Sequence, residues 1–306
     1  QRRSSAPAGF AGARRRLPAT GRAPSLARSP LNLPHGTPRF SSMRIGLIII
    51  GDEILSGRLQ DKHLAKVIEL LGERGLALSW ARYVGDDRDL ITAALADAFA
   101  SGDLVFSCGG IGATPDDHTR QCAAAALGVP LELHPQAREL IVERMRDVAA
   151  EQGLPFEPDR PDNVHRLQMG VFPQGARILP NPYNKIPGFA VRNVHFVPGF
   201  PVMAWPMIAT VLDDAAASLQ GAARSQEQAV IVFGAMEAAL TPLMEAVEAA
   251  HPGVKVFSLP SVDHPQWGRH IELGVKSATA PLAPAFAMLK AGLNQLGASM
   301  GPESVR

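Results

Sequence analysis

Cysteine is scarce in this sequence, which contains only Cys108 and Cys122 among its 306 residues. Two thiols are too few for a disulfide framework or a cysteine metal site, and this scarcity is typical of a reducing compartment, so we expect a cytoplasmic protein. No apolar run approaches the roughly 20 residues that span a bilayer, and no membrane segment is expected. A convincing Ser/His or Cys/His set for nucleophilic catalysis is also lacking.

Acidic residues are absent from residues 1–42, which contain eight arginines. This segment is rich in Arg, Ser, Pro and Ala without lasting periodicity, and it is predicted to be disordered. It is either an organelle transit peptide or a non-native leader upstream of Met43; its prolines favour the leader, because they would interrupt an amphipathic helix. The remainder has 22 basic against 29 acidic residues, a formal charge of about −7. That balance gives no electrostatic reason to expect nucleic-acid binding.

A glycine-rich stretch follows a short apolar run in the first half of the chain. The run Leu104–Phe106 is typical of a buried strand, and Gly109, Gly110 and Gly112 come directly after it. Three glycines so close together let the backbone turn sharply and approach a ligand. In an open α/β sheet such a loop lies at the carboxyl end of a strand, where anionic ligands bind.

Residues 114–117, Thr-Pro-Asp-Asp, suggest that a helix starts directly after this loop. Thr114 is a typical N-cap with proline next to it, and Asp116 and Asp117 would then occupy the first turn. Taken alone, the pattern is that of any well-capped helix. Two carboxylates beside a phosphate would repel it, however, and a divalent cation such as Mg²⁺ would resolve that conflict.

The order of elements from Met43 predicts a mostly parallel sheet covered by helices on both sides. Ile45–Ile50 and Trp80–Val84 are strand-like. Apolar residues at helical spacing lie between these two strands, and again between the second strand and the glycine stretch. The first strand ends in Gly51, Asp52 and Glu53. Alone, this junction is typical of a solvated turn, but the layout can bring its acids close to Asp116 and Asp117.

The chain then contains further predicted elements up to residue 220. Helices are expected at about 135–152 and 202–217, with a strand at 194–197 between them. In the proline-rich region before that strand, Asn181 and Lys185 belong to an ordered loop and could line a pocket, although ordinary turn chemistry also explains them. We therefore predict one α/β/α domain over residues 43–220.

A linker at 221–228 separates this domain from a small α+β unit predicted over residues 226–298. Strands are expected at 229–233, 254–259 and 270–275, and helices at 236–250 and 282–296. Residues 226–298 contain four basic and six acidic side chains and no Gly-x-x-Gly loop. Nucleic-acid binding by this unit is therefore not expected.

The two acidic motifs resemble a known family. Gly51–Ile54 and Gly109–Thr119 are similar to the Gly-Asp-Glu-Leu and Gly-Gly-Leu-Gly-Pro-Thr-x-Asp-Asp-x-Thr motifs of the molybdopterin-binding (MoaB/Mog-like) domain. The version is that at the front of the competence/damage-inducible protein A (CinA) family. The resemblance covers about Met43 to Asp214, and Val232–Glu237 is similar to the start of the KH-like domain that follows in that family.

The resemblance implies a three-layer α/β/α fold and a pocket for a phosphorylated pterin or nucleotide, with molybdopterin as one possible ligand and Mg²⁺ as the cation. It also implies a homo-oligomer. The chemistry would be adenylyl transfer or nucleotide pyrophosphate cleavage, as in an ADP-ribose pyrophosphatase, and both need charge neutralisation more than a protein nucleophile. The acids assigned to metal binding are Asp52, Glu53, Asp116 and Asp117, all but Glu53 being also catalytic. The residues assigned to phosphate or substrate are Gly51, Gly109, Gly110, Gly112, Thr114, Thr119, Asn181, Lys185, Pro198 and Gly199.

The sequence departs from the family pattern at three places. Ala113 replaces the family's proline. Residues 61–63 are Asp-Lys-His where CinA-like proteins often carry Asn-Thr-Asn, and residues 163–166 are Asn-Val-His-Arg where they carry Asn-x-Lys-Gln. The groups that face the ligand can therefore differ. Besides the enzyme, two alternatives stay open: a non-catalytic molybdopterin-binding or carrier protein, and an adaptor that binds through the small unit.

Overall fold

The structure is a computed structural model that describes residues 44–215 and 225–306. The predictions made for residues 1–42 and for linker residues 221–224 lie outside the described residues, and residues 226–228 of the predicted linker belong to a strand. Within them, no helix combines the length and the apolar character needed to cross a bilayer.

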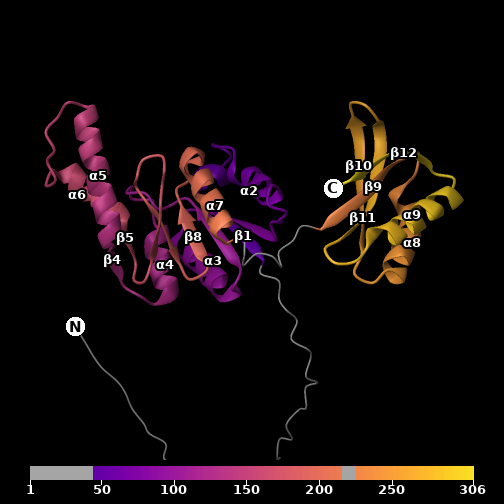
Figure 1. Cartoon of the computed structure of the whole chain (residues 1–306), viewed down its shortest axis with the longest axis horizontal. Coiled ribbons are helices and arrows are strands. Elements are labelled where there is room, and N and C mark those ends of the chain that lie inside the picture. Colours follow the sequence, from indigo (N-terminus) through magenta and orange to yellow (C-terminus); the bar gives the residue numbers. More distant parts are fainter. Residues whose placement is uncertain (1–43, 216–224) are drawn as a thin grey trace, which may run out of the picture. The chain divides into compact units, whose positions relative to one another are not determined.

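The first part contains a six-stranded sheet in the order β2-β1-β3-β8-β7-β6 (Figure 1). Four strands are parallel and the pairs β8–β7 and β7–β6 are antiparallel, so the sheet is mixed and mostly parallel. The strands are β1 (Ile45–Ile50), β2 (Trp80–Val84), β3 (Leu104–Cys108), β6 (Arg177–Leu179), β7 (Gly188–Val191) and β8 (Val194–Val197), and a separate pair is formed by β4 (Leu131–Leu133) and β5 (Val171–Pro173).

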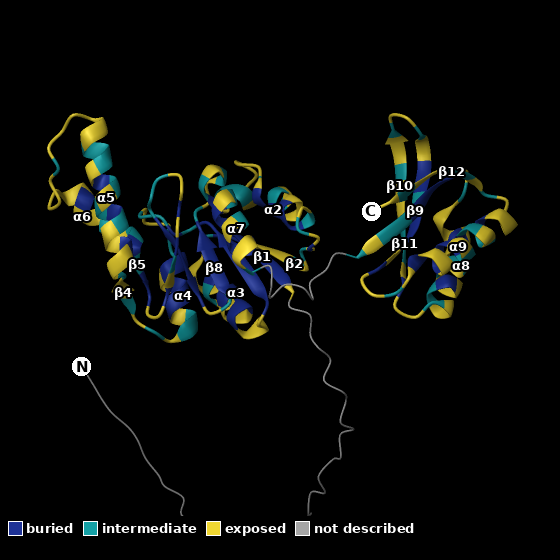
Figure 2. Ribbon diagram, in the orientation of Figure 1, coloured by how far each residue is buried: buried dark blue, intermediate teal, exposed yellow. Residues whose placement is uncertain are grey.

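Helices cover both faces of this sheet, as predicted. Apolar side chains of α2 and α7 pack on one face, and those of α3 and α4 pack on the other. Figure 2 shows buried strands between helices whose outer faces are exposed. The helical elements are α1 (Asp52–Leu55), α2 (His63–Gly72), α3 (Arg88–Ser101), α4 (Thr119–Leu127), α5 (Pro135–Glu151), α6 (Pro161–Arg166), the 3₁₀ helix η1 (Leu167–Gly170) and α7 (Pro201–Ala215).

Continuous apolar runs explain the central strands. All six residues of β1 are buried, as expected of a strand covered by helices on both faces. β3 is likewise buried along its whole length. Since β1, β2, β3 and β8 run parallel, their carboxyl ends lie at one edge of the sheet, where Gly51, Gly85, Gly109 and Pro198 follow them.

The predicted start of the helix after the glycine loop is wrong. Residues 114–117 form a turn, in which the Asp117 N–H donates to the Thr114 carbonyl oxygen at 3.0 Å and the Asp117 carboxylate accepts the Thr114 N–H at 2.9 Å. The helix α4 begins only at Thr119. An acceptor three residues after Thr114 thus closes a local turn, which competes with the N-cap geometry that the same residue types allow.

The second part is a small α+β unit, as predicted, built from β9 (Gln226–Phe233), α8 (Glu237–Ala250), β10 (Lys255–His264), β11 (Gly268–Ser277), α9 (Leu282–Gln295) and β12 (Ser299–Val305). Its antiparallel sheet has the order β10-β11-β9-β12. This β-α-β-β-α-β succession is that of a ferredoxin-like unit. The four-stranded sheet gives no support to the finer KH-like prediction.

The predicted end of this unit at residue 298 is too early. β12 pairs with β9 beyond that point, with a register shift between Met300 and Glu303. Gly301 and Pro302 lie in this irregular stretch, and both residue types are depleted in regular strands. Because of these two residues, β12 lacks the alternating hydrophobic pattern by which a strand is recognised in a sequence.

Candidate functional site

A cavity of about 600 Å³ lies where the carboxyl ends of β1 and β3 meet the loops before α4 and α7. It is lined by these predicted site residues: Gly51, Glu53, Gly109, Gly110, Gly112, Thr114, Asp116, Asp117, Asn181, Pro198 and Gly199. Sequence segments 150 residues apart therefore contribute to one wall. Their individual roles remain predictions.

Contacts inside the protein account for the glycines of the loop. Gly109 and Gly110 have φ angles of +103° and +68°, which side chains other than glycine rarely adopt. A Cβ on Gly109 would lie 2.3 Å from the Ile50 carbonyl oxygen, and one on Gly110 would lie 2.1 Å from the Thr119 Oγ1. The glycines thus let the loop pack against β1 and α4, and their presence alone does not require a ligand.

Thr119 supports the loop from below instead of lining the cavity. It is completely buried, its hydroxyl donates to the Gly109 carbonyl oxygen at 3.1 Å, and its N–H donates to the Gly110 carbonyl oxygen at 3.0 Å. The structure therefore gives no support to its predicted contact with phosphate. Cys108, at the end of β3, is also buried, and burial raises the pKa of its thiol, so it packs as a small apolar residue under the loop.

Asp52 also differs from its predicted place, because it does not line the cavity. Its N–H donates to the Asp86 carboxylate at 2.9 Å, and its own carboxylate accepts the Asp86 N–H at 3.1 Å. This reciprocal pair fastens the start of α1 to the end of β2. Asp86 itself does line the cavity.

Asp86 is thus a candidate site residue that sequence reasoning did not select. Partial burial and the negative charges of Asp52, Glu53 and Asp116 raise its pKa, so the acids that follow three neighbouring strands lie close to one another. The sequence did contain a signal, since Gly85-Asp86 follows β2 as Gly51-Asp52 follows β1. Hydrogen bonding from Thr114 and the nearby His118 lower the pKa of Asp116, which stays ionised.

Lys185 does not reach the cavity. Its ammonium group donates to Glu143 and to Asp147, at 2.7 Å each, and both acids lie on α5. The structure therefore gives no support to the predicted phosphate contact of Lys185, which stays a prediction. Asn181 lines the cavity, but its side chain organises the loop, since its amide donates to Asn184 Oδ1 at 2.8 Å and to the Ile186 carbonyl oxygen at 3.0 Å.

Apolar side chains complete the cavity wall. Phe200 and Leu59 are 66% and 57% exposed, respectively, and both line the cavity with Met203 and Ile186. An exposed ring beside the glycine loop is suited to stacking on a flat heterocycle.

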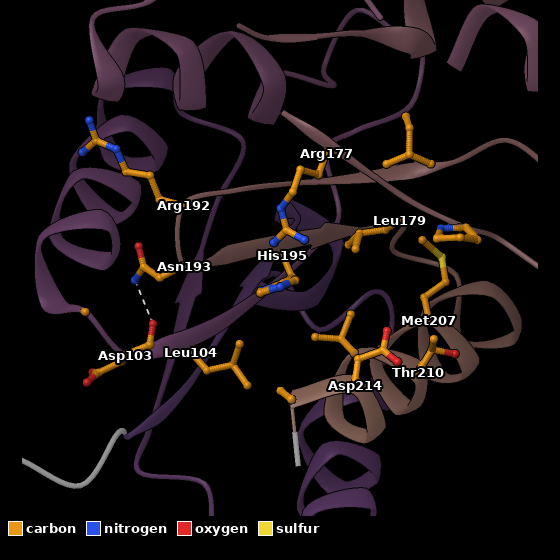
Figure 3. A pocket seen from close by; sticks show the side chains of 15 residues that line it. Asp103, Leu104, Arg177, Leu179, Arg192, Asn193, His195, Met207, Thr210 and Asp214 are labelled. Atoms are coloured by element: carbon orange, nitrogen blue, oxygen red, sulfur yellow. Dashed lines mark hydrogen bonds between the residues drawn. The ribbon is translucent and has the colours of Figure 1, made fainter. Parts of the chain in front are cut away.

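A second cavity, of about 390 Å³, lies near the amino ends of β3 and β8 and contains none of the predicted site residues (Figure 3). His195 is buried in it, with the Arg177 guanidinium directed toward its ring. Burial and then the charge of Arg177 lower the pKa of His195 to about 4, so the ring is neutral at pH 7. The Asn193 amide donates to the Asp103 carbonyl oxygen at 2.7 Å beside it.

A mixed α/β/α domain with a cavity at the carboxyl edge of its sheet defines the class of open-sheet α/β proteins, which bind ligands at that edge. Residues 46–218 match the family model described as "Probable molybdopterin binding domain". The chain therefore belongs to this molybdopterin-binding domain family, and its relatives are CinA-like.

The chain is similar to proteins of several organisms. A CinA-like protein of Anaeromyxobacter dehalogenans is 36% identical over 164 residues, which make up 52% of this chain and 38% of the relative. A protein of Caldivirga maquilingensis is 31% identical over 217 residues, covering 69% of this chain and 79% of that protein. A solved structure of CinA from Thermoplasma acidophilum is 28% identical and covers 56% of this chain and 98% of its own, with a TM-score of 0.47.

Proposed function

We propose that the 600 Å³ cavity binds a phosphorylated pterin or nucleotide, and that the chain cleaves or transfers at a phosphoanhydride bond with Mg²⁺. One observation carries this proposal: the glycine loop, the acids that follow three strands and an exposed aromatic ring all face one cavity. The volume lies within the roughly 300–1,000 Å³ typical of small-molecule sites.

The donor set fits a cation that is shared with the ligand. In the described residues, no three His, Cys, Asp or Glu side chains lie close enough together to form a metal site. Mg²⁺ is usually held by one or two carboxylates together with phosphate oxygens, and Glu53, Asp86 and Asp116 are the carboxylates available for that role. When bound, the ion would neutralise charge that develops on the phosphoryl oxygens.

The chain's own groups would orient the ligand. The Asp117 carboxylate accepts hydrogen bonds from the Thr114 N–H and hydroxyl, at 2.9 and 2.5 Å, and so fixes the loop that faces the phosphate. Phe200 would stack on the ring of the pterin or base. These contacts position the reacting group without a protein nucleophile.

An assay of ADP-ribose hydrolysis with Mg²⁺ tests the proposal. We expect the Glu53→Gln, Asp116→Asn double variant to lose at least about 100-fold in rate, since both carboxylates face the cavity and each transition-state contact removed costs on the order of tenfold or more. Asp159→Asn, an exposed acid outside the cavity, is the matched control. Equal turnover by the double variant and the wild type would overturn the catalytic assignment.

A second candidate function is binding or delivery of molybdopterin without turnover. It is favoured by the match of residues 46–218 to the molybdopterin-binding domain model. This alternative predicts a fluorescent pterin that purifies with the protein, seen by mass spectrometry after denaturation, and no hydrolysis. An empty cavity after expression in a host that makes the cofactor would argue against it.

A further inference from the structure

A smaller cavity of about 360 Å³ adjoins the main one. The two cavities share five lining residues, Ile50, Glu53, Leu59, Gly199 and Pro201. A ligand bound in one cavity would therefore lie next to the other. The smaller cavity lies between β1 and the residues that lead into α2.

The two cavities differ in charge. Four carboxylates line the main cavity and, among the described residues, neither lysine nor arginine does. The adjoining cavity is lined by Arg58 and Lys62, with Glu53 as its one acid. Arg120 donates to the Gly112 carbonyl oxygen beside the loop, so Arg58 and Lys62 are the cations that line the cavity adjoining the main one at β1.

Both cations are available to a ligand. Neither Arg58 nor Lys62 takes part in an ion pair with any residue that the structure describes. The neighbouring acid, Asp61, is occupied, because its carboxylate accepts the N–H groups of His63 and Leu64 and the hydroxyl of Tyr83. Asp61 thus fixes the start of α2 and leaves Lys62 without a counter-charge.

A buried histidine at the cavity wall is a second, independent observation. His63 is only 5% exposed, lines this cavity, and has no hydrogen-bond partner at Nδ1. Its Nε2–H donates to the Gly199 carbonyl oxygen at 2.9 Å. A Cβ on Gly199 would lie 3.4 Å from the Gly109 Cα, so this hydrogen bond links the cavity to the glycine loop.

We propose that the adjoining cavity is an oxyanion subsite, in which Arg58 and Lys62 hold a second phosphate or carboxylate group of the ligand whose first phosphate lies at the glycine loop. This inference rests on the proposed function and makes it more specific, because it defines the ligand class as molecules with two separated anionic groups. His63 positions the wall between the two groups through Gly199.

Titration of the full chain with inorganic phosphate in the absence of Mg²⁺ tests the subsite separately from the metal-dependent reaction. We expect the ring resonances of His63 to shift on titration, and the phosphate affinity to fall roughly tenfold or more in the Arg58→Gln, Lys62→Gln double variant, since each charge-assisted contact is strong. Lys66→Gln, on the next turn of α2 and paired with Glu69, should bind phosphate like the wild type. Acetate in place of phosphate distinguishes a carboxylate subsite from a phosphate subsite.

The two proposals fail in different ways. Phosphate binding that is unchanged in the double variant, or absent without Mg²⁺, would overturn the subsite whatever the catalytic result. If the Glu53→Gln, Asp116→Asn variant loses ADP-ribose turnover but still binds phosphate without Mg²⁺, the result would support both the catalytic assignment and the subsite. Because Arg58 and Lys62 are exposed, their variants are expected to fold, which an unchanged melting temperature verifies.

Discussion

Gly110→Ala is the substitution for which the structure defines a magnitude most directly. The alanine would have to adopt the φ angle of +68°, which costs about 1–2 kcal/mol, and its Cβ would lie 2.1 Å from the Thr119 Oγ1, which adds roughly 1–3 kcal/mol of overpacking. We expect the domain to lose about 2–5 kcal/mol of unfolding free energy. For a domain of this size that corresponds to a decrease in melting temperature of roughly 5–15 °C by calorimetry.

Gly128→Ala is the matched control for the backbone part of this cost. Gly128 ends α4 with a φ of +66°, and a Cβ there would meet no atom within 4 Å. Its substitution should therefore cost only about 1 kcal/mol. The difference between the two variants isolates the clash with Thr119.

A double-mutant cycle with Thr119→Ala tests the cause. That variant alone should lose about 1 kcal/mol, because the hydrogen bond to the Gly109 carbonyl oxygen disappears. Combined with Gly110→Ala it should recover roughly 1–3 kcal/mol relative to the sum of the two single losses. Strict additivity would refute the argument that the Thr119 hydroxyl is what excludes a side chain at position 110.

Three further predictions concern charged groups. Asp86→Asn should stabilise the metal-free protein at neutral pH, because the raised pKa of Asp86 means that stability is lost as the folded form ionises with rising pH. Unfolding midpoints from pH 3 to 7 measure this, and a variant that follows the wild type would contradict it. The wild type should lose up to about 3 kcal/mol of stability as the pH falls from 6.5 to 4, because the unfolded chain binds a proton that the folded His195, with its pKa lowered to about 4, does not. His195→Phe should remove most of this loss. Parallel pH curves for the variant and the wild type would disprove the prediction. Lys185→Gln should lower the free energy of unfolding by no more than about 1 kcal/mol, as expected for exposed ion pairs with Glu143 and Asp147. Ligand affinity, measured by calorimetric titration, should not change. A large loss of affinity would show that Lys185 contacts the ligand.

The sequence predicted the central strands well because burial on both faces leaves an unbroken apolar run, as in β1 and β3. It did not predict β6 and β7. These strands are only three and four residues long and lie in a proline-rich region, where turn residues dominate the local pattern. Their antiparallel pairing depends on contacts with β8 that no local pattern reveals.

The sequence predicted which residues lie together at one cavity better than it predicted where their side chains point. Sequence position identifies which residues follow a strand, and all the glycines assigned from the motifs lie at the cavity. It does not determine where a carboxylate points. Asp52 and Asp86 occupy equivalent positions after neighbouring strands and hydrogen-bond each other reciprocally, but only Asp86 lines the cavity.

The acids argue for a ligand more strongly than the glycines do. The glycines are required by contacts with Ile50 and Thr119, which any protein with this loop would need. Partial burial and the charges of Asp52, Glu53 and Asp116 raise the pKa of Asp86, so placing these acids around one cavity costs stability. A destabilising arrangement is expected to persist where function depends on it. The acids therefore favour a metal ion within the main cavity, whereas an anionic group held at Arg58 and Lys62 needs none, and the phosphate titration without Mg²⁺ separates the two.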